Sequence, residues 1–148
     1  MNSVSAQLKL LDGEVIPLRS SEDCFVCGRQ NPDGLRLSFA VDLDRQTIET
    51  EWIPPGKYRG YSDVLHGGIV ALLLDEAVGK LALSLGMPAV TAELTVRYLR
   101  PVPTGRRLRV RARITEVKRR LLKGEAEVIL EDGTAGARAT AKLMRANT

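Results

Sequence analysis

Histidine and cysteine are scarce in this 148-residue chain. Its one histidine, His66, excludes a metal site or catalytic dyad made of several histidines from a single chain. Its two cysteines, Cys24 and Cys27, form a single CxxC pair, so a tetrahedral site built from cysteine pairs would need two copies of the chain. We interpret the pair as reduced, structural thiols and predict no metal site; metal binding and redox chemistry are the alternatives.

Aromatic residues and long apolar runs are also few. With two Phe, three Tyr and one Trp, the chain has little to stack on bases, and no recognition helix is apparent. We therefore expect no nucleic-acid partner, although the net charge of +4 suits an anionic ligand. The first twenty residues lack the pattern of a signal peptide, and the one extended apolar segment is too short to cross a bilayer. We expect a cytoplasmic protein without a membrane partner.

That apolar segment, residues 66–85, is the element around which we expect the rest of the chain to fold. It is apolar almost all the way round, which predicts a long helix buried in the core, and Gly86 and Pro88 end it. Asp75 lies within the helix among leucine, alanine and valine, where an ionised carboxylate is costly unless it has a partner or a function. Glu76 stands four residues before Lys80, which predicts a structural ion pair.

Alternating side chains predict strands on both sides of this helix. The predicted strands span residues 35–41, 46–53, 90–99, 108–114 and 122–130, with a last strand that ends near Met144. Small residues on that last strand, from Ala135 to Ala141, would let a helix lie close. Because strands without intervening helices pair antiparallel, we predict an α+β fold in which a curved antiparallel sheet wraps around one long central helix. We expect one domain, residues 23–148, after an N-terminal arm, residues 1–22.

Several motifs resemble one family. They are Cys-Phe-Val-Cys-Gly at 24–28, Asn-Pro-Asp-Gly-Leu at 31–35, His-Gly-Gly at 66–68, Asp75 nine residues after His66, and Thr-Ala-Glu-Leu-Thr-Val-Arg-Tyr-Leu-Arg-Pro at 91–101. The chain resembles the hotdog-fold acyl-CoA thioesterase superfamily, in the branch typified by the phenylacetate-pathway thioesterase. This resemblance implies hydrolysis of an acyl-CoA at a site on a dimer interface, in a homodimer or homotetramer, with coenzyme A as part of the substrate and no separate cofactor.

Helix geometry agrees with a shared site. Asp75 follows Gly67 by eight residues, or about 12 Å along a helix, whereas reacting groups must meet within about 3–3.5 Å. One chain's Gly67 and its own Asp75 cannot flank the same carbonyl, so Asp75 must come from a second subunit. The backbone N–H of Gly67 would stabilise the oxyanion, Asp75 would act as general base or nucleophile, and Thr91 could hold the water.

The remaining candidates are expected to bind substrate. His66 could cap the helix, orient the loop or hydrogen-bond the thioester, and the other candidates are Gly68, Tyr61, Arg97 and Arg100, of which the two arginines suit the coenzyme A tail. Arg107, Arg109, Arg111 and Arg113 alternate with apolar residues and are interpreted as a charged outer sheet face, with phosphate binding as the alternative.

Two other functions remain open. Some relatives carry an amide side chain six residues before the histidine of the His-Gly-Gly motif, and here that residue is Gly60, with Tyr58, Tyr61 and Ser62 as candidate substitutes. A non-catalytic acyl-CoA-binding module is therefore the first alternative. A hydro-lyase, in which an acid and His66 act on one carbon skeleton, is the second.

Overall fold

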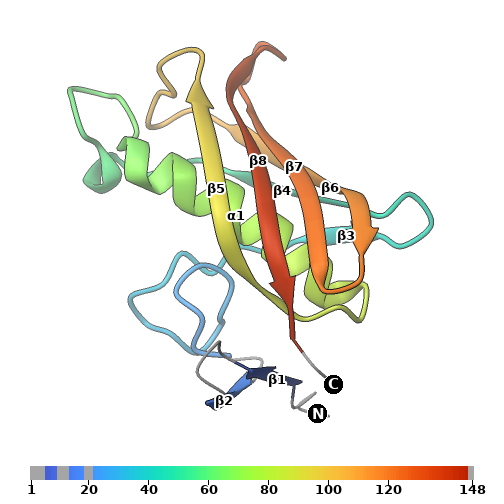
Figure 1. Cartoon of the computed structure of the whole chain (residues 1–148). Coiled ribbons are helices and arrows are strands. Elements are labelled where there is room, and N and C mark those ends of the chain that lie inside the picture. Colours follow the sequence, from blue (N-terminus) through green and yellow to red (C-terminus); the bar gives the residue numbers. More distant parts are fainter. Residues whose placement is uncertain (1–5, 10–13, 19–21, 147–148) are drawn as a thin grey trace.

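One long helix lies against a six-stranded antiparallel sheet in the computed structural model, which describes residues 6–9, 14–18 and 22–146 (Figure 1). No helix in these residues is long and apolar enough to span a bilayer. The elements are β1 (Ala6–Lys9), β2 (Val15–Leu18), β3 (Ala40–Asp42), β4 (Thr47–Trp52), the 3₁₀ helix η1 (Gly56–Tyr58), α1 (Gly67–Ser84), β5 (Ala89–Tyr98), β6 (Leu108–Lys118), β7 (Leu121–Ile129) and β8 (Ala135–Arg145).

The order of the strands in the large sheet is β3-β4-β6-β7-β8-β5, and every neighbouring pair is antiparallel. Strand β5 directly follows α1 in the chain but lies at the far edge of the sheet, beside β8 (Figure 1). Strands β1 and β2 form a separate antiparallel pair. The predicted α+β hotdog fold, a curved sheet around one long helix, is confirmed.

Small residues on the sheet let α1 pack closely. Ala137, Ala139 and Ala141 of β8 are buried, as their spacing predicts. On β7, a Cβ added to Gly124 would lie 2.6 Å from Cγ1 of Val78 on α1, so only glycine fits there. The face of α1 toward the sheet contributes these buried residues to the core: Val70, Leu73, Leu74, Ala77, Val78, Leu81 and Ala82.

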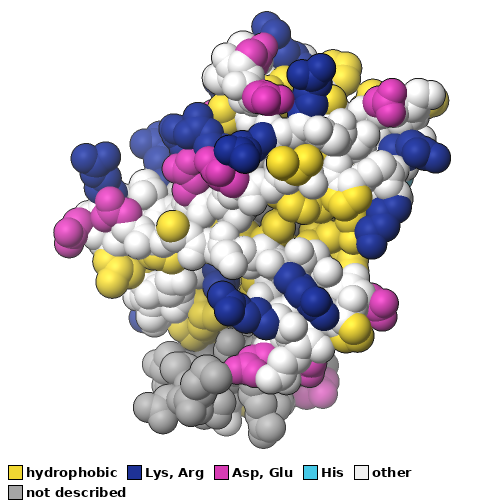
Figure 2. All heavy atoms as spheres, turned by 180° about the vertical axis from the view of Figure 1, so that it is seen from behind, with side chains coloured by type: hydrophobic (Ala, Val, Ile, Leu, Met, Phe, Trp, Pro, Cys, Tyr) yellow, Lys and Arg dark blue, Asp and Glu magenta, His cyan; other side chains and the backbone are white. Residues whose placement is uncertain are grey.

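The opposite face of α1 is only half-buried, so the prediction of a helix enclosed on all sides is wrong for a single chain. Ile69, Leu72, Asp75 and Gly79 lie on this open face. The sheet covers one side of the helix, and the described part of the chain has no second layer over the other side. Seen from behind the view of Figure 1, the molecule shows an area of hydrophobic side chains bordered by basic ones (Figure 2).

The segment before β3 departs from its predicted form. A strand was expected over residues 35–41, but β3 spans only Ala40–Asp42. The backbone N–H groups of Leu35 and Leu37 instead donate to the carbonyls of Phe25 and Val26, both at 2.9 Å. The alternating pattern therefore reflects contact with the loop that carries Cys24 and Cys27, called the CxxC loop below, rather than pairing with β4.

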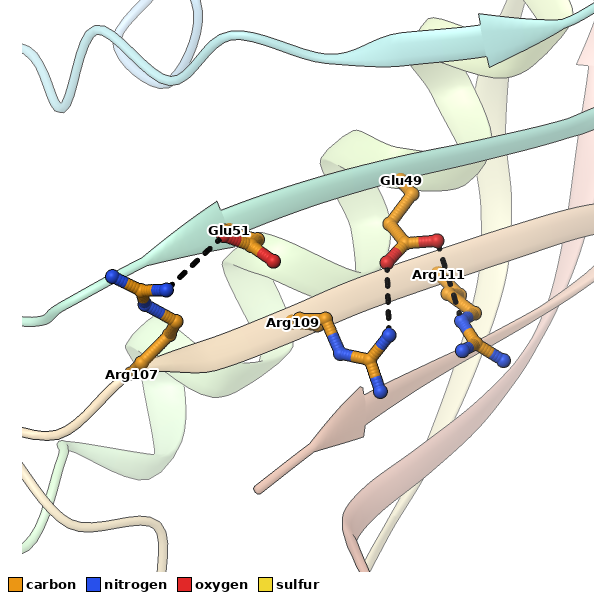
Figure 3. A network of polar contacts seen from close by, with 5 residues as sticks. All are labelled: Glu49, Glu51, Arg107, Arg109 and Arg111. Carbon is orange, nitrogen blue, oxygen red and sulfur yellow. Dashed lines mark hydrogen bonds and ion pairs between the residues drawn. The ribbon is translucent and has the colours of Figure 1, made fainter. Parts of the chain in front are cut away.

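The outer face of the sheet is charged, as predicted, and its charges are paired across strands. The arginines before and along β6 form cross-strand ion pairs. Figure 3 shows Arg107 with Glu51 at 3.8 Å, Arg109 with Glu49 at 3.3 Å and Arg111 with Glu49 at 3.4 Å. Arg113 pairs with Glu125 at 2.9 Å. Leu108, Val110 and Ala112 point inward and are buried. Neutralised arginines on this face suit a solvated surface better than a phosphate site.

Candidate active site

The N-terminus of α1 presents one free backbone donor. His66 is the N-cap, and its Nδ1 accepts the N–H of Gly68 at 2.9 Å. Its carbonyl accepts the N–H groups of Ile69 and Val70. Among the described residues, only solvent is left for the N–H of Gly67, which the first turn of a helix cannot satisfy internally. Of the three candidates in the His-Gly-Gly motif, Gly67 is therefore the one with a free backbone N–H to offer.

Tyr98 of β5 holds this end of the helix and was missed by sequence reasoning. Its hydroxyl donates to the carbonyl of Gly67 at 2.7 Å, and its ring lies 3.5 Å from where a Cβ of residue 67 would be. Leu94, Val96 and Tyr98 alternate along one face of the strand, and this spacing is the signal that could have placed Tyr98 toward the helix.

A pocket of about 550 Å³ opens at the same place. Its lining brings together four of the predicted site residues, namely Tyr61, His66, Gly67 and Arg100. Gly60 also lines the pocket, and a Cβ there would approach His66 at 3.5 Å. Residue 60 therefore faces the helix N-terminus, which is where the amide side chain that some relatives carry at this position would have to lie. Tyr61 is 86% exposed and leaves the pocket open to solvent.

The carboxylate lies elsewhere on the helix, beside the predicted threonine. Thr91 Oγ1, on β5, donates to Asp75 Oδ1 at 2.6 Å. Asp75 is half-buried and Thr91 is exposed, on the edge strand of the sheet. Since Gly67 and Asp75 belong to one continuous helix, they are separated by about 12 Å. In a single chain the predicted site residues therefore fall into two separate groups.

Arg97 is the candidate that joins neither part. It lines a broad concavity of about 910 Å³ together with Thr95, Arg111 and Arg138, among residues of the charged outer face. Tyr98, the next residue on β5, points to the helix side instead. In one chain Arg97 therefore lies away from the pocket at the helix N-terminus, whereas Arg100 lines it, and a role of Arg97 in binding the coenzyme A tail stays a prediction.

Comparison with protein families decides the identity. A model of the thioesterase superfamily matches residues 63–137, which include α1, β5, β6 and β7, and this is more than half of the chain. The chain belongs to the thioesterase superfamily. A search of curated proteins finds no match.

Solved structures agree with this membership. A phenylacetic acid degradation-related protein from Ralstonia eutropha JMP134 is 28% identical, with a TM-score of 0.67, over 73% of this chain and 83% of that one. This likeness confirms the predicted resemblance to the phenylacetate-pathway branch.

Two more distant structures show the same fold. A thioesterase superfamily protein has a TM-score of 0.78 at 24% identity, over 83% of this chain, which spans 60% of that protein's length. A protein from Streptococcus mutans UA159, solved bound to acetyl CoA, has a TM-score of 0.70 at 20% identity, over 76% of this chain and 90% of that one.

In this thioesterase-superfamily chain, the residue after Asp75 has an unexpected partner. The predicted ion pair between Glu76 and Lys80 does not form within 4.0 Å in the described structure. Instead, Cys24 Sγ donates to Glu76 Oε1 at 3.6 Å, and Lys80 Nζ donates to Cys27 Sγ at 3.7 Å. Burial first, and the nearby Glu76 carboxylate second, raise the pKa of the Cys27 thiol to about 12.

Proposed function

We propose that the chain hydrolyses an acyl-CoA thioester to the free acid and coenzyme A, at a site that two copies of the chain share. The observation that carries this proposal is the hydrogen bond of 2.6 Å from Thr91 to Asp75, because it pairs a carboxylate with a hydroxyl on an accessible edge of the protein. Superfamily membership and the acetyl CoA bound to the Streptococcus mutans protein support the substrate class.

The N–H of Gly67 is the proposed oxyanion donor. Attack on a thioester carbonyl creates a tetrahedral intermediate with negative charge on oxygen, and a free N–H at a helix N-terminus meets that charge with the helix dipole behind it. The bond from Tyr98 to the Gly67 carbonyl holds this part of the helix in place. Glycine at this position lets the thioester approach the backbone without a Cβ in the way.

Asp75 and Thr91 would supply the nucleophile. Because the Thr91 hydroxyl donates its proton to Asp75, its oxygen remains free to accept a hydrogen bond from water. The carboxylate would then take a proton from that water as it attacks the carbonyl carbon, or attack directly to form an anhydride that water cleaves. The C–S bond breaks in either case, and coenzyme A leaves as the thiol.

The second subunit is part of the proposal. Gly67 and Asp75 of one chain are about 12 Å apart, so each site would take Gly67 from one copy and Asp75 from the other. The half-buried open face of α1 and the edge strand β5 are the surfaces that a second copy would cover. The assembly would be a homodimer or a homotetramer, and dimerisation would be a condition of activity.

The pocket at the helix N-terminus would take the substrate's thioester end. His66 and Tyr61 line it, and the guanidinium of Arg100 suits the anionic coenzyme A tail. Gly68 would contribute by fixing His66, whose Nδ1 accepts its N–H. Coenzyme A is part of the substrate, so no separate cofactor is needed. The location proposed for this activity is the cytoplasm, as expected from the sequence.

The test is release of free thiol from short, medium, long and aromatic acyl-CoAs by wild type and Asp75→Asn. We expect turnover of one substrate class by wild type and a fall of at least about 100-fold in kcat in the variant, the usual scale for a lost general base. Glu93→Gln, which removes an exposed carboxylate on β5, the strand of Thr91, is the control and should retain activity.

An alternative function is a non-catalytic acyl-CoA-binding module. It is favoured by Gly60, which leaves no amide beside His66 to support the carbonyl or the water. Calorimetric titration with a non-hydrolysable acyl-CoA analogue distinguishes the two functions. Tight binding together with no turnover of any ester by wild type would overturn the thioesterase proposal, and equal turnover by Asp75→Asn would show that another carboxylate acts.

A further inference from the structure

Two thiols and a carboxylate converge beside the middle of α1. The Sγ atoms of Cys24 and Cys27 and a carboxylate oxygen of Glu76 all lie within 4.8 Å of one another. All three residues are half-buried, and Cys24 Sγ is 3.6 Å from Glu76 Oε1. Two sulfurs and an oxygen at this spacing can be the corners of one coordination tetrahedron, because Zn–S bonds are about 2.3 Å and Zn–O bonds about 2.0–2.2 Å long.

The loop that carries the two cysteines is fixed by a backbone hydrogen bond and by a buried side chain. The N–H of Gly28 donates to the carbonyl of Cys24 at 2.9 Å, closing a turn around the pair. A side chain at residue 28 would collide with the backbone of Glu22 and Cys24, so the turn requires glycine. Val26, between the two cysteines, is 2% exposed and anchors the loop in the core. Both sulfurs are thus fixed on the side of the loop that faces α1.

The two charged side chains beside the sulfurs, Glu76 and Lys80, contact the sulfurs rather than each other. Glu76 and Lys80 have the spacing of a helical ion pair, which is the simplest arrangement for an isolated carboxylate and ammonium. Instead, Glu76 contacts Cys24, and Lys80 Nζ lies 3.7 Å from Cys27 Sγ. With a divalent cation, two thiolates, one carboxylate and one ammonium sum to zero charge, so a half-buried cluster of this kind needs no further counter-ion.

We propose that Cys24, Cys27 and Glu76 bind one Zn²⁺ ion, with a fourth position open to water. Thiolates select a soft cation, and a tetrahedral set of sulfur and oxygen ligands suits zinc. Binding forms two Zn–S bonds and one Zn–O bond, and the two thiol protons pass to solvent. This replaces our interpretation of the cysteines as thiols without a metal.

The ion would have a structural role, distinct from hydrolysis. It would tie the loop of residues 22–37, which no strand of the large sheet pairs with, to the middle of α1. Glu76 and Asp75 are neighbours in sequence, but successive helical residues point about 100° apart, so the ion is not placed to touch the proposed nucleophile.

The first measurement is zinc binding by the full chain. Protein reduced with a phosphine and freed of metal is titrated with zinc chloride in competition with a chromophoric chelator, and X-ray absorption is recorded on the loaded protein. We expect one ion per chain and sulfur scattering at about 2.3 Å. Cys27→Ser and Glu76→Gln should each weaken the affinity at least about 10- to 100-fold, the loss typical even of groups behind the ligands. Asp33→Asn, an exposed carboxylate on the same loop, should bind as wild type does.

Thermal unfolding of wild type alone gives a second readout that needs no variant. Zinc that binds the folded chain should raise the melting temperature in proportion to the logarithm of its concentration. The proposal is overturned if reduced wild type does not compete with the chelator, if the absorption spectrum lacks sulfur ligands, or if Cys27→Ser binds as tightly as wild type. A Cys24–Cys27 disulfide that persists under the phosphine would also overturn it.

Discussion

Thr91 is the side chain whose proposed role can be tested most cleanly. Its hydroxyl is 2.6 Å from Asp75, and a hydrogen bond to a charged group contributes about 1.5–3 kcal/mol. We therefore expect Thr91→Val, which keeps the shape, to lower kcat about 10- to 100-fold with little change in KM, as measured by thiol release.

Thr95→Val is the control for this variant. Thr95 is on the same strand but lines the outer concavity, so its loss should leave kcat unchanged. An unchanged kcat in Thr91→Val would mean that the threonine only packs beside Asp75, and the proposed water-holding role would have to be abandoned.

Individual residues also mark what sequence could and could not predict about the site. Asp75 and Thr91 were predicted as a pair, and the structure brings them into contact. Tyr98 and the partners of Glu76 were missed, because they depend on which elements meet in space. Local spacing favoured an ion pair between Glu76 and Lys80, but the loop carrying Cys24 and Cys27 packs there and both charged groups turn to the sulfurs.

At the scale of elements, the closeness of α1 to the sheet depends on Gly124. Val78 is 1% exposed and β-branched, so it cannot easily move away from an added methyl group. We expect Gly124→Ala to lower the free energy of unfolding by about 1–3 kcal/mol, as overpacking does, in urea titrations at one protein concentration.

A glycine on α1 itself, Gly79, provides the comparison. A Cβ added to Gly79 would meet no atom of this chain within 4 Å, so Gly79→Ala should be neutral or gain up to about 1 kcal/mol from helix propensity. Equal stability of Gly124→Ala and wild type would contradict the close packing of α1 against β7.

The elements themselves were largely predictable. Periodicity located α1 and the strands β4 to β8, because each has one face in the core and the pattern records it. The pattern failed at residues 35–39, where alternation arises from pairing with the CxxC loop instead of a neighbouring strand. The pattern also predicted too much burial for α1, because the sequence does not distinguish apolar residues on its open face from those in the core.

For the whole molecule, that open face is the link between fold and proposed function. A single chain leaves Ile69, Leu72 and Asp75 half-buried, and no strand among the described residues pairs with the outer edge of β5. An exposed strand edge beside apolar side chains is a surface that proteins usually cover. A second copy placed there would also bring an Asp75 toward the Gly67 of its partner, which one chain cannot do.

The central claim, hydrolysis at a site shared by two copies, is tested most directly by mixing two inactive variants. Gly67→Pro removes the proposed oxyanion donor at the first helical position, where proline is tolerated, and the extended His66 before it (ψ 132°) is compatible with proline. Asp75→Asn removes the carboxylate. Each variant alone should release little thiol.

When the two variants are unfolded together and refolded at equal concentrations, half of the dimers are mixed. Each mixed dimer has one intact site, with Gly67 from one chain and Asp75 from the other. We predict recovery of about one quarter of wild-type thiol release, as two-fold symmetry requires. A size tag on one of the two variants separates mixed from unmixed dimers and shows how far the chains have exchanged. No recovery from properly exchanged dimers would contradict the shared site and show that each chain acts alone or not at all.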